Sequence, residues 1–360
     1  MYCFSKETPC WRSCLMKVLK FGGTSIEDVD AIKRAVEIIK SKLHEQPVVV
    51  CSAMGKTTSQ LLAIANNIAD GQNQAARDKL DEIKFQHLSI LKEFVPDYET
   101  REIWKTLNNY FLEMLKLFEG LTILRELTDQ SHDKILSYGE LISTTLMAEI
   151  FNGQGIKGEW LDSRELIKTN DEFKAAVPDY SLTNPNLKKA ILPLCEKGDV
   201  PVLQGFIGST QNGLTTTLGF EGSDFTASII ANAIDAKEVQ IWKTVEGLMT
   251  TDPRMFDGAK TVAKISYQEA AELTFFGAKA LHPKSIGPAQ EKNIPIRILD
   301  SRNPEIVGTV ISNESGEQKD LVQSITFKRQ TVCVTVWSQK NSYKLLRRVL
   351  EVLDRTHLSP

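Results

Sequence analysis

The sequence is poor in cysteine, has no long apolar run and carries little net charge. Six cysteines in 360 residues are too few for a disulfide framework, which favours a reducing compartment, the cytoplasm. The longest uncharged apolar stretches, such as 48–55, are far shorter than the roughly 20 residues of a membrane-spanning helix. The 43 Lys and Arg residues against 46 Asp and Glu leave a formal charge of −3, so no basic field indicates nucleic acid. We therefore expect a soluble cytoplasmic protein with neither a membrane nor a nucleic acid as partner.

Three of the cysteines, Cys3, Cys10 and Cys14, lie close to the start of the sequence. A zinc site at Cys10 and Cys14 is the weaker interpretation, because no second pair of ligands lies nearby. Residues 1–15 also have no continuous apolar core, which a signal peptide requires. We expect an unstructured leader over 1–15, with structured sequence beginning at Met16.

The chain as a whole has an ordinary globular composition, 42% hydrophobic and 25% charged, and is long enough for two or three domains. Residues 16–21 and 48–51 are predicted strands, and a predicted helix comes after each of them. This order is typical of a parallel sheet with helices on its faces. We expect Thr24 or Ser25 to cap the first helix, with Asp28 placed for a capping box.

Residues 74–152 are predicted to be mostly helical, because apolar residues recur at helical spacing. They form a helical subdomain or lid in this interpretation. The α/β pattern then resumes, with strands predicted at 157–161, 200–207, 239–242 and 294–299, and helices at 223–233, 267–276 and 283–292.

A new unit begins near Leu321, with a strand predicted at 332–337 and a helix at 343–353. One strand and one helix cannot close a core by themselves. We therefore interpret this last segment as a fragment of a larger unit.

The first motif with a chemical meaning is K-F-G-G-T-S at 20–25, at the end of the first predicted strand. The glycines let backbone N–H groups approach a ligand, a helix N-terminus favours anions, and Lys20 supplies a positive charge. The pattern therefore suits a polyphosphate. A plain glycine turn beside a surface lysine is the alternative.

The loop after the second predicted strand contains M-G-K-T-T at 54–58. It is not a Walker P-loop, because Val50 stands where that motif needs its first glycine. The loop nevertheless lies at the end of a parallel strand, where α/β sheets bind ligands. Ser52, Thr57 and Thr58 are placed to donate hydrogen bonds to a carboxylate, and solvated hydroxyls are the alternative.

Four further charged residues stand beside glycine or proline, or near them. Glu140, at a predicted helix start, either stabilises the helix dipole or binds a substrate ammonium. Ser223 is predicted to cap a helix in which Asp224 either favours the dipole, orients a lysine or binds Mg²⁺. Arg254 and Lys279 lie in loops and suit nucleotide phosphates.

Taken in order, these motifs resemble those of aspartokinases in the amino-acid kinase family. The resemblance covers Met16 to about Ile311. The motifs are K-F-G-G-T-S, S-A-M-G-K-T-T, Y-G-E-L-I-S-T, W-L-D-S-R, Q-G-F-I-G-S, T-T-D-P-R and F-G-A-K-A-L-H-P.

The resemblance implies a three-layer α/β sandwich with a mostly parallel central sheet over residues 16–312. It implies an N-terminal lobe over 16–198 that holds aspartate and a C-terminal lobe over 199–312 that holds MgATP. Residues 318–360 resemble the start of a regulatory ACT domain, which is an α+β unit.

The same resemblance implies ATP-dependent phosphorylation of the β-carboxylate of L-aspartate to 4-phospho-L-aspartate, the first step of Lys, Thr and Met synthesis. The β-carboxyl group, with a pKa of about 3.9, is already ionised at pH 7 and needs no general base. ATP and Mg²⁺ are the implied cofactors, no metal is held by protein ligands alone, and we expect a homo-oligomer.

By motif match, the resemblance assigns catalysis to Lys20, Asp224 and Lys279. It assigns aspartate binding to Ser52, Thr57, Glu140 and Ser223. It assigns nucleotide binding to Gly22, Gly23, Thr24, Lys243, Thr244, Arg254 and Lys279.

Two departures from the family pattern keep a second interpretation open. G-R-G-G-S-D is here G-F-E-G-S-D, so Phe220 and Glu221 replace an arginine and a glycine. W-T-D-V is here W-K-T-V, with Lys243 and Thr244. Arg164 and Lys243 are the candidate replacements for the missing cation. The alternative function is a degenerate homologue with low activity that acts as a nucleotide-binding or subunit-partner protein, or a kinase for another amino acid.

Overall fold

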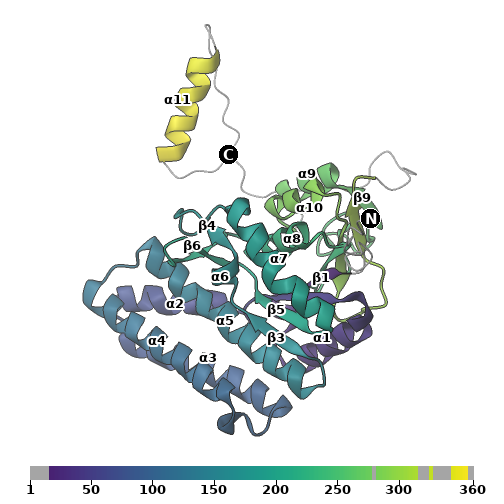
Figure 1. The fold of residues 1–360 in the computed structure, drawn as a ribbon. Helices are drawn as coiled ribbons and strands as arrows, with labels where there is room; N and C mark the ends of the chain where they lie inside the picture. Colours follow the sequence, from purple (N-terminus) through teal and green to yellow (C-terminus); the bar gives the residue numbers. More distant parts are fainter. Residues whose placement is uncertain (1–15, 278–280, 315–323, 327–341, 356–360) are drawn as a thin grey trace, which may run out of the picture. The chain divides into compact units, whose positions relative to one another are not determined.

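The strands at the centre of the fold form from short runs in which most residues are apolar. β1 (Lys17–Phe21) reads K-V-L-K-F and β2 (Pro47–Cys51) reads P-V-V-V-C, and all of β2 is buried. Strands that are covered on both faces of a parallel sheet are apolar throughout rather than alternating. The computed structural model in Figure 1 describes residues 16–277, 281–314, 324–326 and 342–355.

The other strands are β3 (Gly158–Leu161), β4 (Lys168–Thr169), β5 (Val200–Gln204), β6 (Ile207–Thr210), β7 (Thr215–Thr217), β8 (Glu238–Lys243), β9 (Lys264–Ser266), β10 (Ile296–Asp300) and β11 (Thr309–Ser312). Within the described residues, eight strands form a sheet in the order β3-β5-β2-β1-β8-β10-β11-β9, and β4-β6-β7 form a small second sheet. Neighbours in the large sheet are parallel except β10 and β11. The prediction of a mostly parallel central sheet is confirmed.

The helices are α1 (Val29–Ser41), α2 (Thr57–Ala69), α3 (Asn73–Phe94), α4 (Glu102–Leu124), α5 (Asp129–Gly153), α6 (Ser163–Leu166), α7 (Tyr180–Lys197), α8 (Gly222–Ile234), α9 (Tyr267–Phe275), α10 (Gly287–Glu291) and α11 (Ser342–Arg355). Short 3₁₀ turns lie at Gly23–Ser25, Leu43–Glu45, Tyr98–Thr100 and Pro283–Ser285.

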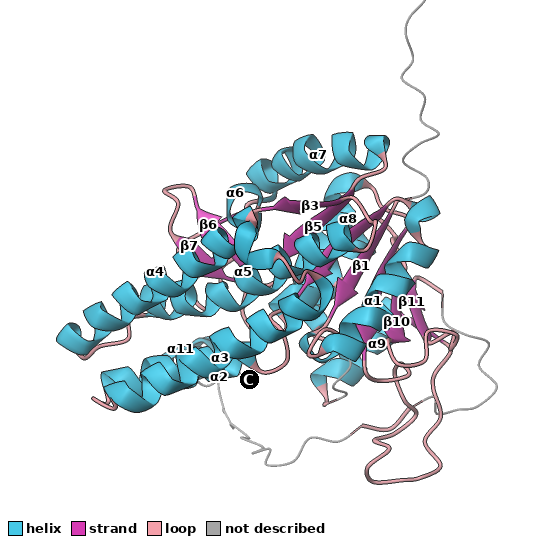
Figure 2. Ribbon diagram, turned by 90° about the horizontal axis from the view of Figure 1, so that it is seen from below, coloured by secondary structure: helices cyan, strands magenta, loops and turns pink. Residues whose placement is uncertain are grey.

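Successive residues of β1 point to opposite faces of the sheet and so belong to two different cores. Leu19 and Phe21 pack in a core with residues of α1 to α5, whereas Val18 packs in a core with residues of α7 and α8. Figure 2 shows these two sets of helices on either side of the strands. The three-layer sandwich that the resemblance implied is therefore confirmed.

The first helix begins later than predicted. It starts after Asp28, whose carboxylate accepts a hydrogen bond from the backbone N–H of Ala31 at 2.8 Å. The hydroxyl of Ser25 instead donates to the carbonyl of Trp242 in β8 at 3.1 Å. The prediction that Thr24 or Ser25 caps this helix was wrong, because Asp28 supplies the cap and Ser25 ties the preceding turn to the neighbouring strand.

The predicted strand at 200–207 is two strands that belong to different sheets. The chain turns at Phe206, which has a φ of 69° and whose backbone N–H donates to the hydroxyl oxygen of Thr226 at 3.0 Å. A positive φ is uncommon for a residue other than glycine, and it redirects the chain out of the large sheet. The prediction of one continuous strand was wrong, because nothing in an apolar run signals that local conformation.

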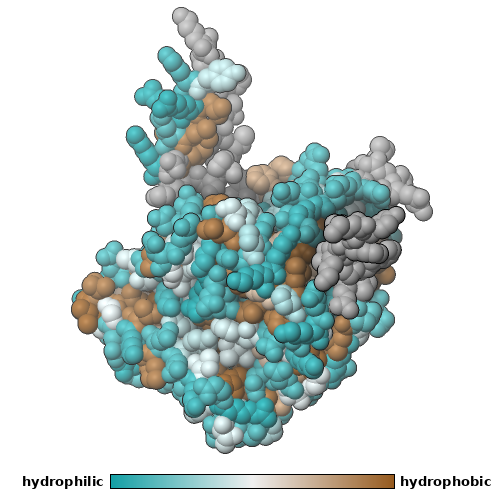
Figure 3. Space-filling model, in the orientation of Figure 1, coloured by the Kyte–Doolittle hydropathy of each residue, from teal (hydrophilic) through white to brown (hydrophobic). Residues whose placement is uncertain are grey.

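Other predicted elements agree with the structure more closely. Residues 74–152 are mostly helical, in α3, α4 and α5, and the predicted helix at 343–353 lies within α11. On α11, apolar side chains gather along one side in the space-filling view (Figure 3). The predicted leader at 1–15 and strand at 332–337 lie outside the described residues, and the division into two lobes stays a prediction. No helix in the described ranges is both long and apolar enough to span a bilayer.

A close approach between β5 and α8 generates a stability prediction. A Cβ atom on Gly205 would lie 2.4 Å from the Cβ of Ser223, so Gly205→Ala must displace the start of α8. We expect it to lower the free energy of unfolding by about 1–3 kcal/mol. Gly120→Ala in α4 is the control, because nothing lies within 4 Å of its added methyl group. The control should raise stability by about 0.5–1 kcal/mol in urea unfolding, and equal stability of Gly205→Ala and the native protein would contradict the packing described.

Candidate active site

Three charged side chains, two of them buried and the third, Lys243, partly buried, meet where β1, β8 and α8 come together. Asp224, which is 1% exposed, lies between two lysines: its Oδ1 is 2.6 Å from Nζ of Lys20 and its Oδ2 is 2.8 Å from Nζ of Lys243. Lys20 lies in β1, and Lys243 ends the adjacent parallel strand β8. The sheet thus supplies two amines side by side, and α8 supplies the carboxylate that joins them.

The charge states of this cluster depend on burial and on the opposite charges. Burial alone raises the pKa of a carboxyl, but the charges of Lys20 and Lys243 outweigh it and hold the pKa of Asp224 below its ordinary value. Burial likewise lowers the pKa of a lysine, but Asp224 and Glu221 hold the pKa of Lys243 above its ordinary value. The cluster therefore carries a charged carboxylate between charged amines.

Glu221 adds a second carboxylate to the cluster, 3.8 Å from Nζ of Lys243. Burial and the charge of Asp224 raise its pKa, although Lys243 opposes them. Glu221 also starts α8 with a left-handed φ of 53°, with no side-chain cap. The prediction that Ser223 caps this helix was wrong, because the chain reaches α8 through the backbone conformation of Glu221 and Ser223 is already inside the helix.

The glycine pair brings two loops into contact at the carboxyl edge of the sheet. A Cβ on Gly23 would lie 2.7 Å from the carbonyl oxygen of Ala53 and 2.8 Å from that of Gly55, so only glycine fits there. The backbone N–H of Gly55 donates to the carbonyl of Gly23 at 3.0 Å. Beside this turn, the hydroxyl oxygens of Thr24 and Thr244 lie 3.4 Å apart. The loops after β1, β2 and β8 thus converge where parallel sheets bind ligands.

A cavity of about 410 Å³ opens at this edge, which is a typical size for a small-molecule site. Its lining includes Ser52 from the loop after β2, Thr58 from the first turn of α2, Glu140 from α5, and Phe220 and Ser223 around the start of α8. The cavity therefore brings together Ser52 and Ser223, which belong to two separate motifs of the sequence.

Glu140 is the most buried acid of that cavity, with 3% of its surface exposed. Its Oε1 accepts a hydrogen bond from the backbone N–H of Ala53 at 3.2 Å, and its buried Oε2 has no hydrogen-bond partner among the residues that the structure describes. Burial raises the pKa of Glu140 to about 8. The predicted position at a helix start was wrong: Glu140 lies in the middle of α5, and Gly139 beside it is what lets α5 approach the loop.

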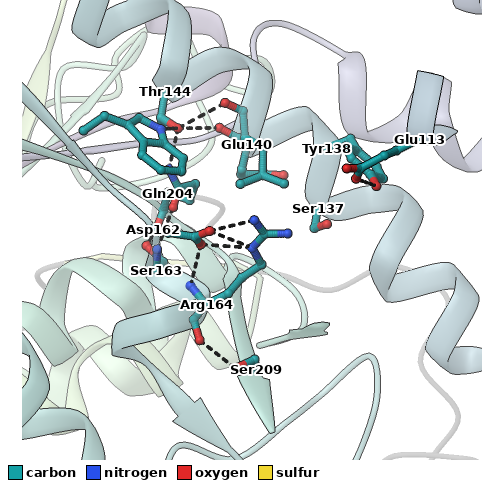
Figure 4. A network of polar contacts seen from close by, with 12 residues as sticks. Glu113, Ser137, Tyr138, Glu140, Thr144, Asp162, Ser163, Arg164, Gln204 and Ser209 are labelled. Atoms are coloured by element: carbon teal, nitrogen blue, oxygen red, sulfur yellow. Dashed lines mark hydrogen bonds and ion pairs between the residues drawn. The ribbon is translucent and has the colours of Figure 1, made fainter. Parts of the chain in front are cut away.

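Side chains of three elements hold the backbone of α5 in place behind Glu140 (Figure 4). The hydroxyl of Thr144 donates to the carbonyl of Glu140 at 2.8 Å and accepts bonds from Trp160 at 3.1 Å and Gln204 at 2.6 Å. Gln204 in turn accepts from the backbone N–H of Ser163 at 2.7 Å. We missed these positioning residues in the sequence, since neither Thr144 nor Gln204 belongs to a pattern with a chemical meaning of its own.

Other predicted site residues lie elsewhere or have partners of their own. The hydroxyl of Thr57 donates to the carbonyl of Met54 at 2.7 Å, and its neighbour Thr58 lines the cavity instead. The guanidinium of Arg254 pairs with Asp252 in its own loop at 2.6 Å. Lys279 lies outside the described residues. In the described part of the chain no three His, Cys, Asp or Glu side chains group as metal ligands.

The buried carboxyl of Glu140 predicts a pH-dependent stability. Its pKa is about 8 in the folded protein against an ordinary 4.5. Between these values the folded protein keeps a proton that the unfolded chain has lost, so the free energy of unfolding falls as the pH rises. Glu140→Gln removes this titration and should be more stable than the native protein at pH 8 by at least about 1 kcal/mol.

The measurement is urea unfolding from about pH 5 to pH 8.5, with the exposed Glu126→Gln as the control. The control should reproduce the native profile, because an isolated surface change has little effect. A Glu140→Gln protein that also kept the native slope would contradict a neutral buried carboxyl.

Comparison with known proteins places this geometry in a family. The sequence profile of the amino acid kinase family matches residues 16–300. The chain is 36% identical over 344 residues to lysine-sensitive aspartokinase 3 of Escherichia coli (strain K12), which covers 95% of this chain and 74% of that protein. It is 33% identical over 357 residues to the chloroplastic aspartokinase 1 of Arabidopsis thaliana, covering 95% of this chain but 60% of that protein. The chain thus spans about three fifths of that plant relative.

A solved structure agrees with the sequence comparison. The crystal structure of E. coli aspartokinase III in complex with aspartate and ADP superposes with a TM-score of 0.83 at 32% identity, covering 96% of this chain and 75% of that one. The fold, the order of the motifs and these relatives agree, so the resemblance is confirmed. The chain belongs to the amino acid kinase family and, within it, to the aspartokinases.

Proposed function

We propose that the chain transfers the γ-phosphoryl group of ATP to the β-carboxylate of L-aspartate, giving 4-phospho-L-aspartate and ADP, at the start of Lys, Thr and Met synthesis. The observation that carries this proposal is the buried Lys20–Asp224–Lys243 cluster beside a cavity that contains the unpaired carboxyl of Glu140. The cluster suits phosphates, and the cavity suits an amino acid. The names of the relatives, and the aspartate and ADP in the related crystal structure, support the same pair of substrates.

The chemistry asks the protein mainly to bring anions together. An oxygen of the ionised β-carboxylate attacks the γ-phosphorus, the bond from that phosphorus to the β,γ-bridging oxygen breaks, and ADP leaves. Mg²⁺ enters with ATP as part of the substrate. No proton has to be removed from the nucleophile, so positioning and neutralisation of charge carry the rate. The amines of Lys20 and Lys243 supply positive charge, and Asp224 holds both amines in place.

Glu140 suits the ammonium group of the amino acid. At pH 7 a carboxyl with a pKa of about 8 is mostly protonated in the free protein. An ammonium group in contact with the unpaired Oε2 favours the ionised form and lowers that pKa. Aspartate binding near pH 7 therefore couples to release of a proton from Glu140. A buried, desolvated carboxylate is a strong partner for a positive charge.

A kinase of low activity, or one for another amino acid, is the second candidate. Glu221 favours it, because a carboxylate 3.8 Å from Lys243 adds negative charge beside the proposed phosphate site. Phe220, 81% exposed at the cavity, supplies no charge for a substrate carboxylate. Measuring ADP release with ATP over a panel of amino acids separates the two: aspartate should be the preferred acceptor, and preference for another acceptor would favour the second candidate.

The location and assembly of the protein remain proposals. We place it in the cytoplasm, where ATP is available and thiols stay reduced. Cys51 and Cys195 are buried free thiols, which agrees with that placement. A homo-oligomer stays a prediction, and light scattering of the purified chain tests it.

Lys20→Met tests the phosphate role. We expect aspartate-dependent ADP release to fall by about 100-fold or more, because a fixed charge that stabilises a transition state is worth about 2.7–4 kcal/mol. Lys243 still pairs with Asp224 in this variant, so the protein should remain folded. The matched control is Lys17→Met in the same strand, because Lys17 pairs with Glu45 at 2.7 Å and not with Asp224. The control should keep the native rate. A Lys20→Met protein with more than about a tenth of that rate would show that Lys20 does not act on the phosphates.

A further inference from the structure

The buried cluster leaves one charged group of the proposed substrate without a partner. Aspartate has two carboxylates, and when the β-carboxylate is the nucleophile, the α-carboxylate also lies in the cavity. A carboxylate taken out of water needs a positive partner. The need for that partner rests on the proposed function, since it arises only when aspartate is the substrate.

The two cations suggested by the sequence as replacements have other partners. The amine of Lys243 is 2.8 Å from the buried carboxylate of Asp224. The guanidinium of Arg164 holds Asp162 through three hydrogen bonds, at 2.9 Å, 3.1 Å and 2.6 Å, and Figure 4 shows the two side chains facing each other. Among the described residues that line the cavity, Lys174 carries the permanent positive charge.

The backbone of Lys174 is held in an unusual conformation by a buried acid. Its φ is 70°, in the left-handed region that favours glycine. The carboxylate of Asp133, which is fully buried, accepts hydrogen bonds from the backbone N–H groups of Lys174 at 2.8 Å and Thr217 at 2.7 Å. It also accepts from the hydroxyl of Thr217 at 2.9 Å. Lys174 thus occupies a position at which glycine would be less strained. Asp133 fixes this turn to the cavity wall.

The turn lies directly against the loop that leads into α8. A Cβ atom on Gly219 would lie 3.1 Å from the carbonyl oxygen of Lys174, so the two segments are in close contact. Gly219, Phe220 and Ser223 all line the same cavity as Lys174. Lys174 therefore lies on the cavity wall next to the loop that contains Phe220. Phe220 is the residue that replaces the arginine of the family pattern.

The amine of Lys174 has a weak partner in the structure. It pairs with the carboxylate of Asp129 in the first turn of α5, one turn before His132, which lines the cavity. The two side chains are 48% and 58% exposed. Ion pairs between exposed groups are weak, because water screens them. The amine can therefore exchange Asp129 for a less hydrated carboxylate inside the cavity at small cost.

We propose that Lys174 binds the α-carboxylate of aspartate and so determines the preference of this chain for an amino dicarboxylic acid. Glu140 and Lys174 then hold the ammonium and the α-carboxylate, and the β-carboxylate is left to face the phosphates. This arrangement gives the ammonium and the α-carboxylate each a partner of opposite charge and leaves the β-carboxylate free to attack phosphorus.

Lys174→Gly tests the proposal without endangering the fold, because glycine accepts a φ of 70° with less strain. We expect KM for aspartate to rise by about tenfold or more, with KM for ATP unchanged. The inhibition constant of β-alanine, which is aspartate without its α-carboxylate, should stay the same. Lys174→Arg should recover most of the affinity for aspartate, since it restores the positive charge.

Arg125→Gly is the matched control, because Arg125 is an exposed cation with a φ of 52° that does not line the cavity. It should leave both constants unchanged. An unchanged KM for aspartate in Lys174→Gly, or a parallel rise for β-alanine, overturns the role of Lys174 while the proposed function stands. Absence of any aspartate-dependent ADP release from the native protein overturns the proposed function, and the role of Lys174 with it.

Discussion

One buried carboxylate determines the organisation of the site. Asp224 lies between Lys20 and Lys243, which the parallel pairing of β1 and β8 brings side by side. Two lysines this close repel each other unless an anion separates them, and a buried anion is stable only with such partners. These ion pairs therefore link the positions of the start of α8 and the ends of β1 and β8. Glu221 joins the same network through Lys243. In the proposed function, this preformed pair of amines is what receives the phosphates.

The rest of the site depends on places where backbones approach closely. Gly23 lets the loops after β1 and β2 touch, Gly139 brings α5 onto the second of those loops, and Gly205 lets α8 reach the sheet. Each contact leaves no room for a methyl group. Together they place the buried carboxyl of Glu140 in the cavity and the ion cluster beside it. The proposed phosphate and amino-acid sites then lie next to each other because the loops at this edge are in contact.

Most of the fold could be predicted from the sequence, because buried parallel strands and amphipathic helices leave periodic patterns. The errors fell where one residue's backbone conformation decides the course of the chain. The left-handed φ of Phe206 divides a predicted strand, and that of Glu221 starts α8 without the predicted cap. The motifs indicated the glycine pair, Lys20 and Glu140, and the resemblance assigned their roles. It did not indicate Lys174, since an exposed lysine in a polar segment belongs to no pattern until the fold brings it to the cavity.

The most direct test of phosphoryl transfer is to trace the oxygen that attacks phosphorus. The purified chain is mixed with MgATP and aspartate labelled with ¹⁸O in its β-carboxylate, and the products are examined by ³¹P NMR. Transfer to the β-carboxylate predicts an acyl phosphate whose phosphorus signal carries the isotope shift of one bridging ¹⁸O, formed in equal amount with ADP. Formation of ADP with unlabelled inorganic phosphate alone, or an acyl phosphate without that shift, would contradict transfer to the β-carboxylate of aspartate.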